Sequence, residues 1–95
     1  MPKLGIAIVG TGMIGAVHRR AALLAGAEVR GVAASTPQRA QEVAQAWNVP
    51  RAYRDIEDVA ADPQVQVVHV CTPNHLHRPM AQAALAAGKH VICEK

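Results

Sequence analysis

The stretch Gly10-Thr11-Gly12-Met13-Ile14-Gly15 decides the fold of this 95-residue chain. It follows an apolar run over residues 4–9, which is typical of a buried parallel strand, and it precedes a segment with helical spacing of apolar residues. A strand, a glycine turn and a helix in this order form the dinucleotide-binding fingerprint. In that fingerprint Gly10 allows a tight turn, Gly12 lets the backbone approach a pyrophosphate, and Gly15 lets the helix pack close to the strand. The N–H groups and the positive dipole end of the helix would then face the phosphates.

The helix after the glycine turn is expected over residues 13–24, with Gly26 as its C-terminal stop. Its spacing puts four apolar side chains on one face, namely Ile14, Val17, Ala21 and Leu24. The next helix is expected to begin at Thr36 as N-cap, with Pro37 at its first position.

The remaining elements alternate along the chain. We expect strands near residues 28–34, 51–53, 65–71 and 89–93, and helices over 37–47, 55–61 and 75–87. The order β-α-β-α-β-α-β-α-β predicts an α/β fold, a Rossmann-type doubly wound parallel sheet that is incomplete at its C-terminus. In the usual strand order of this fold, the loops at residues 10–15 and 71–77 face each other, and Lys95 lies on the same rim.

Composition narrows the class of protein. The net charge is +3, and the basic residues are scattered rather than gathered in a stripe with aromatics, which disfavours a nucleic-acid partner. Trp47 and Tyr53 are the only aromatic residues, so the core is expected to consist of Ala, Val, Ile and Leu. No span approaches the ~20 apolar residues that cross a membrane, and we expect a soluble, cytoplasmic protein without a membrane partner. Cys71 and Cys93 are predicted to be buried, reduced thiols.

The end of the second expected strand bears on the choice of cofactor. A plain NAD site would have an acidic residue there, ~20 residues after the glycines, to bind the ribose 2′-OH. The sequence has Ala34, Ser35 and Thr36 instead. Ser35 and Thr36 can donate hydrogen bonds, and Arg39 could reach a 2′-phosphate, which favours NADP slightly over NAD. The alternative is that Ser35 and Thr36 only cap the helix.

Histidine and lysine residues near the expected rim are candidates for metal binding, cofactor binding or proton transfer. The spacing of Cys71, His75 and His77 fits no common structural zinc site, so no metal is predicted. His18 is as consistent with a half-buried position against the sheet as with cofactor binding, and His69 is expected to be structural. Lys95 could donate to a carbonyl or alkoxide oxygen, although a terminal Glu-Lys pair is also consistent with a solvated end.

Three stretches together resemble the Gfo/Idh/MocA oxidoreductases, the glucose–fructose oxidoreductase and inositol dehydrogenase group. They are Gly10-Thr11-Gly12-Met13-Ile14-Gly15 with His18, then Cys71-Thr72-Pro73-Asn74-His75-Leu76-His77, and finally Ala87-Gly88-Lys89-His90-Val91-Ile92-Cys93-Glu94-Lys95. The resemblance covers all 95 residues. It implies the N-terminal dinucleotide-binding domain of a two-domain enzyme that moves a hydride between NAD(P) and the CH–OH group of a sugar, polyol or related substrate.

The resemblance also implies roles for individual residues. Gly10, Thr11, Gly12, Met13, Ile14 and Gly15 would hold the pyrophosphate. Ser35 would lie in the region that discriminates the adenosine ribose, where Thr36 and Arg39 are the neighbouring candidates. The stretch Cys71, Thr72, Pro73 and Asn74, together with His77, would line the cofactor toward the nicotinamide. Glu94 and Lys95 would begin the family's Glu-Lys-Pro motif, with Lys95 catalytic or positioning the nicotinamide.

The chain departs from the family in length. It stops before the expected proline and before the substrate domain, which usually also makes a homo-oligomer interface, so the 95 residues alone are expected to be inactive. A stand-alone module that senses NAD(P) without catalysis is the competing hypothesis, and a methyltransferase-like use of the same glycine turn is a third. The identity and stereochemistry of the substrate do not follow from the sequence.

Overall fold

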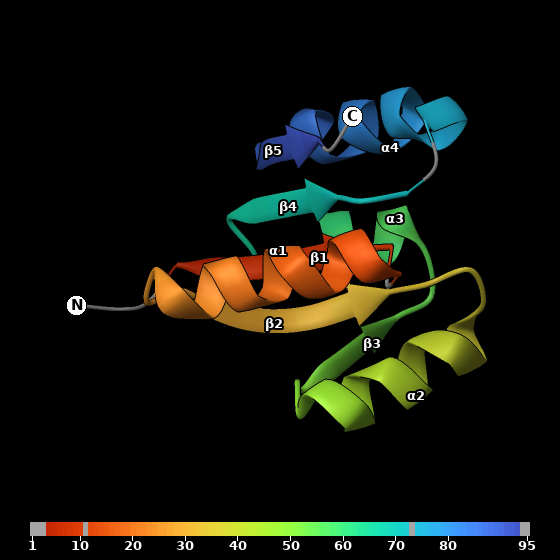
Figure 1. Ribbon diagram of the computed structural model, residues 1–95. Coiled ribbons are helices and arrows are strands. Elements are labelled where there is room, and N and C mark those ends of the chain that lie inside the picture. The colour runs from red at the N-terminus through yellow and green to blue at the C-terminus, as the bar shows by residue number, and fades with distance from the viewer. Residues whose placement is uncertain (1–3, 11, 73, 94–95) are drawn as a thin grey trace.

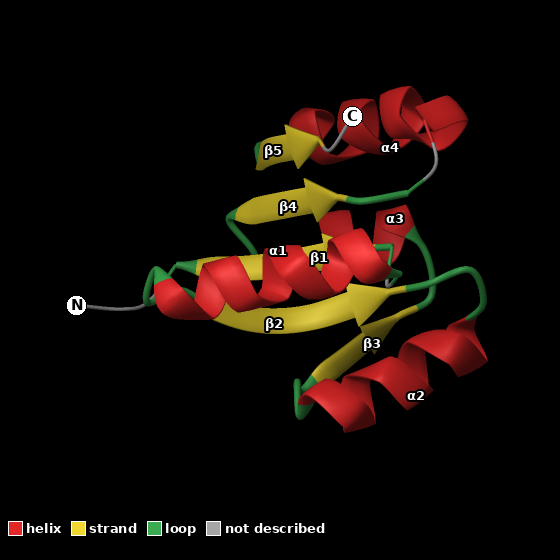
Figure 2. Ribbon diagram, in the orientation of Figure 1, coloured by secondary structure: helices red, strands yellow, loops and turns green. Residues whose placement is uncertain are grey.

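The computed structural model describes residues 4–10, 12–72 and 74–93, without the side chains of residues 13, 14 and 74–77. Five strands alternate with four helices (Figures 1 and 2). In chain order the elements are β1 (Gly5–Val9), α1 (Met13–Leu24), β2 (Glu28–Ala33), α2 (Pro37–Trp47), β3 (Arg51–Tyr53), α3 (Ile56–Ala60), β4 (Val67–Val70), α4 (Asn74–Ala86) and β5 (His90–Cys93). The predicted alternation is confirmed, and the strands near 28–34 and 65–71 are shorter than predicted.

All neighbouring strands pair in parallel, in the order β3-β2-β1-β4-β5. The direction of strand succession reverses between β1 and β4, so this is the topological switch point of the sheet. Helices α1 and α2 lie in front of the sheet in Figure 1, and α3 and α4 lie behind it. The Rossmann-type α/β fold predicted from the sequence is confirmed.

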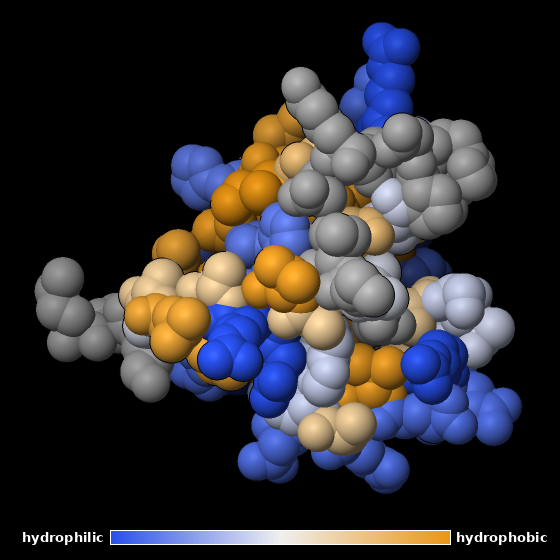
Figure 3. All heavy atoms as spheres, in the orientation of Figure 1, coloured by the Kyte–Doolittle hydropathy of each residue, from blue (hydrophilic) through white to orange (hydrophobic). Residues whose placement is uncertain are grey.

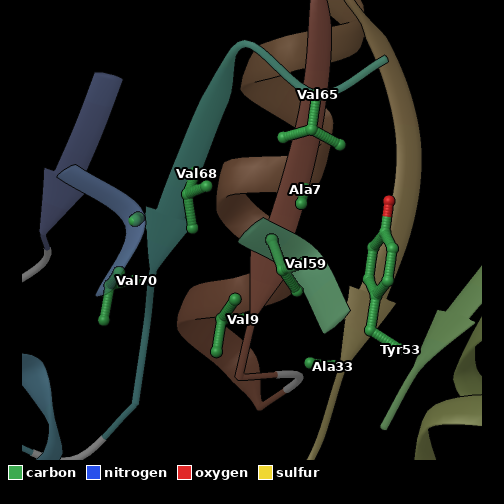
Figure 4. Close-up of a cluster of buried hydrophobic side chains, with 9 residues drawn as sticks. Ala7, Val9, Ala33, Tyr53, Val59, Val65, Val68 and Val70 are labelled. Atoms are coloured by element: carbon green, nitrogen blue, oxygen red, sulfur yellow. The ribbon is translucent and has the colours of Figure 1, made fainter. Parts of the chain in front are cut away.

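Small aliphatic side chains fill both faces of the sheet. The cluster on the α3–α4 side is drawn in Figure 4 and consists of Ala7, Val9, Ala33, Tyr53, Val59, Val65, Val68, Val70 and Ala84. The cluster on the α1–α2 side consists of Ile6, Ile8, Ala22, Val29, Val32, Val43, Ala44 and Val67. Adjacent residues of one strand enter opposite clusters because side chains alternate across a sheet. The Ala, Val and Ile expected from composition form the core, but none of the described leucines belongs to it, and Tyr53 does.

The single core tyrosine is held by a buried carboxylate. The Tyr53 hydroxyl donates to Asp62 Oδ2 at 2.7 Å, and the amide of Gln64 donates to Asp62 Oδ1 at 2.9 Å. Burial and the hydrogen bond to Asp62 raise the pKa of Tyr53. Burial also tends to raise the pKa of Asp62, but the Tyr53 hydroxyl, the Gln64 amide and Arg51 outweigh it and lower that pKa. This polar cluster fixes β3 against the turn that leads to β4.

Helix ends carry capping residues, among them the predicted Thr36 and Gly26. Thr36 Oγ1 accepts a hydrogen bond from the amide of Arg39 at 3.0 Å, and Asp55 Oδ1 accepts one from the amide of Asp58 at 2.9 Å. Gly26 after α1 and Gly88 after α4 have φ of +82° and +81°, which is the left-handed conformation common at helix C-termini.

The predicted apolar face of α1 is not its buried face. Val17 and Leu24 are 58% and 80% exposed, and Ala21 is exposed as well, whereas Gly15 and Ala22 are buried. The crossover from β1 to β2 places α1 over these two strands, and small residues let it approach them closely. The bulkier apolar face is therefore turned away from the sheet. The side chain of Ile14 lies outside the described residues.

The two thiols also differ from the prediction that both are buried. Cys71 is half-buried, and Cys93 is exposed. Cys71 packs against the cluster on the α1–α2 side. Cys93 on β5 pairs with Val70 on β4, and the Val70 side chain belongs to the cluster on the α3–α4 side. Because paired residues share a face, the two thiols lie on opposite faces of the sheet and do not form a redox pair in this fold.

Candidate dinucleotide-binding site

The glycine turn joins three strands at the carboxyl edge of the sheet. Gly10 has φ of +99°, and its amide donates to the carbonyl oxygen of Ala33 at the end of β2, at 2.8 Å. A Cβ atom added to Gly10 would lie 2.7 Å from the carbonyl carbon of Cys71, which follows β4. The amide of Cys71 in turn donates to Val9 at 2.7 Å. The loops after β1 and β4 are therefore in direct contact, as the strand order predicts.

The other two glycines of the turn have different surroundings. A Cβ on Gly15 would overlap the carbonyl oxygen of Gly10, so Gly15 is needed for α1 to pack on the turn. Gly12 is exposed, and a Cβ there would meet no described atom within 4 Å. Gly12 is the N-cap of α1 and supplies no side-chain hydrogen bond to the helix, and the first turn contains no acidic residue. The start of α1 thus offers open space and backbone N–H groups to an anion.

Residues of α1 and α2 enclose a cavity beside this turn. A cavity of about 450 Å³ is lined by Gly12, Ala16, Arg39, Glu42, Val43, Ala46 and Trp47. Arg39 Nη1 lies 3.6 Å from Glu42 Oε1, one helical turn further along α2. Ser35 and Thr36 are exposed at the start of α2, and Thr36 is occupied with capping. The structure therefore brings Arg39 near the glycine turn, together with an acidic residue that was not singled out from the sequence.

The loop after β4 forms the other wall of the rim. Cys71 and Thr72 are half-buried, and the Thr72 hydroxyl donates to Met80 Sδ at 3.5 Å. β5 pairs with β4 in parallel, so the carboxyl end of β5 lies at the same edge of the sheet. Several predicted site residues fall where the structure gives no placement. Thr11, Pro73, Glu94 and Lys95 lie outside the described residues, and for Met13, Ile14, Asn74 and His77 only the helical backbone is described.

A pair of histidines lies beneath this rim. Nδ1 of His18 on α1 is 2.9 Å from Nδ1 of His69 on β4, and the two rings meet edge to face with centroids 5.1 Å apart. One of the two nitrogens must carry the hydrogen and the other must accept it. Burial and the neighbouring His18 lower the pKa of His69. The expected structural role of His69 agrees with this position. The pairing itself was missed, because residues 18 and 69 become neighbours only when β4 lies beside β1.

Two other classes of site are absent from the described part of the chain. Residues 4–10, 12–72 and 74–93 contain no group of three or more His, Cys, Asp or Glu side chains that could hold a metal ion. None of the helices described is both long and apolar enough to cross a lipid bilayer.

Known oxidoreductases are similar to this chain in sequence. A family model described as "Oxidoreductase family, NAD-binding Rossmann fold" matches residues 4–95. Levoglucosan dehydrogenase of Pseudarthrobacter phenanthrenivorans is 36% identical over 104 aligned residues, which cover 100% of this chain and 27% of that protein. Mouse trans-1,2-dihydrobenzene-1,2-diol dehydrogenase is 46% identical over 68 residues, covering 72% of this chain and 20% of that protein. The chain thus spans less than a third of the length of either relative.

Solved structures show the same likeness in three dimensions. An NAD-binding oxidoreductase from Klebsiella pneumoniae superposes with a TM-score of 0.89 at 39% identity, covering 99% of this chain and 27% of that one. A levoglucosan dehydrogenase in complex with NADH and L-sorbose superposes with a TM-score of 0.87 at 36% identity, covering 100% of this chain and 28% of that one.

Proposed function

Because the chain belongs to the Gfo/Idh/MocA oxidoreductase family with an NAD-binding Rossmann fold, we propose that it binds a nicotinamide dinucleotide across the β1–β4 switch point. One observation carries the proposal. Gly12 is open to solvent at the uncapped start of α1, whereas Gly10 and Gly15 are closed in by backbone atoms. Of the three glycines of the turn, only Gly12, the one that a pyrophosphate would approach, has free space around it.

The roles that we propose for single residues follow from the resemblance of their sequence stretches to the family. The pyrophosphate would be held by Gly10, Thr11, Gly12, Met13, Ile14 and Gly15. The adenosine ribose would lie near Ser35, Thr36 and Arg39, and the nicotinamide end near Cys71, Thr72, Pro73, Asn74, His77, Glu94 and Lys95. The bound cofactor supplies the site that accepts or donates the hydride. Lys95 would hydrogen-bond the substrate oxygen and take up or release its proton, since lysine is an effective general acid or base when its pKa is lowered.

The activity we propose belongs to a longer enzyme. Dehydrogenases are among the relatives of this chain, and they give no support to a stand-alone sensing module. We propose oxidation of a CH–OH group of a sugar, polyol or related compound, with a substrate domain outside these 95 residues. The chain alone is expected to bind cofactor without turnover, because hydride transfer needs donor and acceptor held within ~3–3.5 Å of each other. A cytoplasmic location and a homo-oligomeric full-length enzyme remain predictions.

We further propose that NADPH binds somewhat more tightly than NADH. Arg39 lines the cavity beside Gly12 and is the first cationic residue after β2 in the sequence. No acidic residue follows β2 directly, so the usual acceptor for the ribose 2′-OH of NAD is missing there.

Titration of the 95-residue chain with NADH, NADPH and S-adenosylmethionine tests the proposal. The first two are expected to bind. Gly12→Ala is expected to weaken both at least roughly tenfold, because its methyl group would occupy the pyrophosphate's place, yet to leave the unfolding temperature unchanged. Gly26→Ala is the matched control at the other end of α1. Its φ of +82° strains an alanine, so it should lower the unfolding temperature and leave cofactor affinity intact. Saturation by S-adenosylmethionine alone would overturn the assignment.

A further inference from the structure

The cavity next to the glycine turn contains one cation and one anion of the described side chains. Arg39 and Glu42 both line it, together with Gly12 at the start of α1. Their side chains are 57% and 58% exposed, so both charges remain accessible to a ligand entering the cavity. Arg39 Nη1 and Glu42 Oε1 are 3.6 Å apart. A charged ligand group beside one of them is therefore also within the range of electrostatic interaction with the other.

The backbone positions of Arg39 and Glu42 on α2 are fixed by the packing and capping of the helix. The amide of Arg39 donates to the N-cap Thr36 at 3.0 Å, which anchors the first turn of α2 beside the end of β2. Glu42 follows three residues later on the same face of the helix. The adjacent residues Val43 and Ala44 are buried in the core cluster, so α2 cannot rotate to carry Glu42 away from the cavity without unpacking them.

We propose that Glu42 is a specificity-determining residue that offsets Arg39 in the choice between NADPH and NADH. The inference rests on the proposed function, since it requires the adenosine ribose to lie beside this cavity. A 2′-phosphate carries two negative charges at neutral pH, and Arg39 attracts it. The Glu42 carboxylate repels the same phosphate and competes with it for the Arg39 guanidinium. For NADH, the ribose 2′-OH can donate to the Glu42 carboxylate, an acceptor that the end of β2 does not provide.

The pair therefore keeps the two cofactors close in affinity. Removing the Glu42 charge should shift the cofactor preference toward NADPH, and removing the Arg39 charge should shift it toward NADH. An ion pair with a merely structural role would not produce these opposite shifts. An exposed pair of this kind contributes little to folding, so neither substitution should change the unfolding temperature appreciably.

The experiment compares Glu42→Gln and Arg39→Ala by fluorescence titration with NADH and NADPH. Glu42→Gln is expected to tighten NADPH binding roughly three- to tenfold, the effect of one screened charge several ångströms away, and to leave NADH unchanged or slightly weaker. Arg39→Ala should weaken NADPH by a similar factor and narrow or reverse the preference. Both effects should shrink in high salt.

Glu57→Gln is the matched control. It removes the same charge from the exposed first turn of α3, on the other side of the sheet, and should leave the ratio of the two affinities unchanged. The inference is overturned if Glu42→Gln leaves that ratio within twofold of the parent chain, or if Glu57→Gln shifts it equally. If the parent chain binds neither NADH nor NADPH, the proposed function fails, and this inference fails with it.

Discussion

At the scale of single residues, Gly10 and Gly12 differ in what surrounds them although they belong to one motif. Gly10 has φ of +99°, and an added Cβ would lie 2.7 Å from the Cys71 backbone, whereas Gly12 has open space around it. We expect Gly10→Ala to lower the free energy of unfolding by about 2 kcal/mol or more, through backbone strain and displacement of the loop after β4. Urea unfolding of Gly10→Ala beside Gly12→Ala measures this. Equal stability of the two variants would contradict the structure.

The sequence predicts single residues well where one backbone conformation requires one residue type. The spacing of Gly10, Gly12 and Gly15 predicts the turn, and Thr36 followed by Pro37 predicts the start of α2. Glu42 escapes this reasoning because an acidic residue in a helix is ordinary. Its relation to Gly12 arises only when α2 lies beside the start of α1.

At the scale of elements, α1 and β4 meet through a histidine pair with a direct consequence for pH. The pKa of His69 is lowered by burial and by His18, so the folded chain keeps His69 neutral while the unfolded chain takes up a proton below pH ~6.5. His69 therefore costs no stability above that pH, and the folded state loses stability as the pH falls below it. The loss is at most about 1.4 kcal/mol for each pH unit.

Urea unfolding at pH 7.5 and 5.5 tests this prediction. Replacing His69 by Leu, an apolar residue of similar size, should reduce the difference between the two unfolding free energies. His90→Gln is the control, because His90 is exposed on β5 and its removal should leave the difference intact. An equally large pH effect in His69→Leu would show that another group is responsible.

The elements themselves are largely predictable, since each has its own periodicity and its own stop signals. Gly26 and Thr36 mark helix ends that the structure confirms. The buried face of α1 does not follow from its periodicity. Periodicity shows which residues share a face, but small residues such as Gly15 and Ala22 face the sheet here because close approach matters more than apolar bulk.

At the scale of the whole molecule, the parallel sheet follows from strict alternation of strands and helices, and the position of the site follows from the strand order. The extent of the exposed apolar surface does not follow from either the alternation or the strand order. A groove of about 570 Å³ lies on the α1 side of β4 and β5, and we call it the apolar groove. It is lined by Leu4, Ile6, Ala21, Ala22, Ala25, Gly26, Ala27, Val67, His69 and Ile92. Figure 3 shows apolar atoms gathered over β4 and β5 beside α1.

The apolar groove should make the folded 95-residue chain bind a hydrophobic dye, because contiguous apolar surface of this kind is uncommon on isolated globular proteins. Ile92 at its edge and Leu24 on the adjoining helix are 46% and 80% exposed. Replacing both, as Leu24→Gln with Ile92→Thr, should reduce dye fluorescence severalfold. The cost should be about 1 kcal/mol of unfolding free energy, because Leu24 is mostly exposed and Ile92 is only about half-buried. Leu85→Gln is the control, because Leu85 is 59% exposed on α4 behind the sheet. Dye binding that persists in the double variant, or that falls as much in Leu85→Gln, would show that the groove is not the surface responsible.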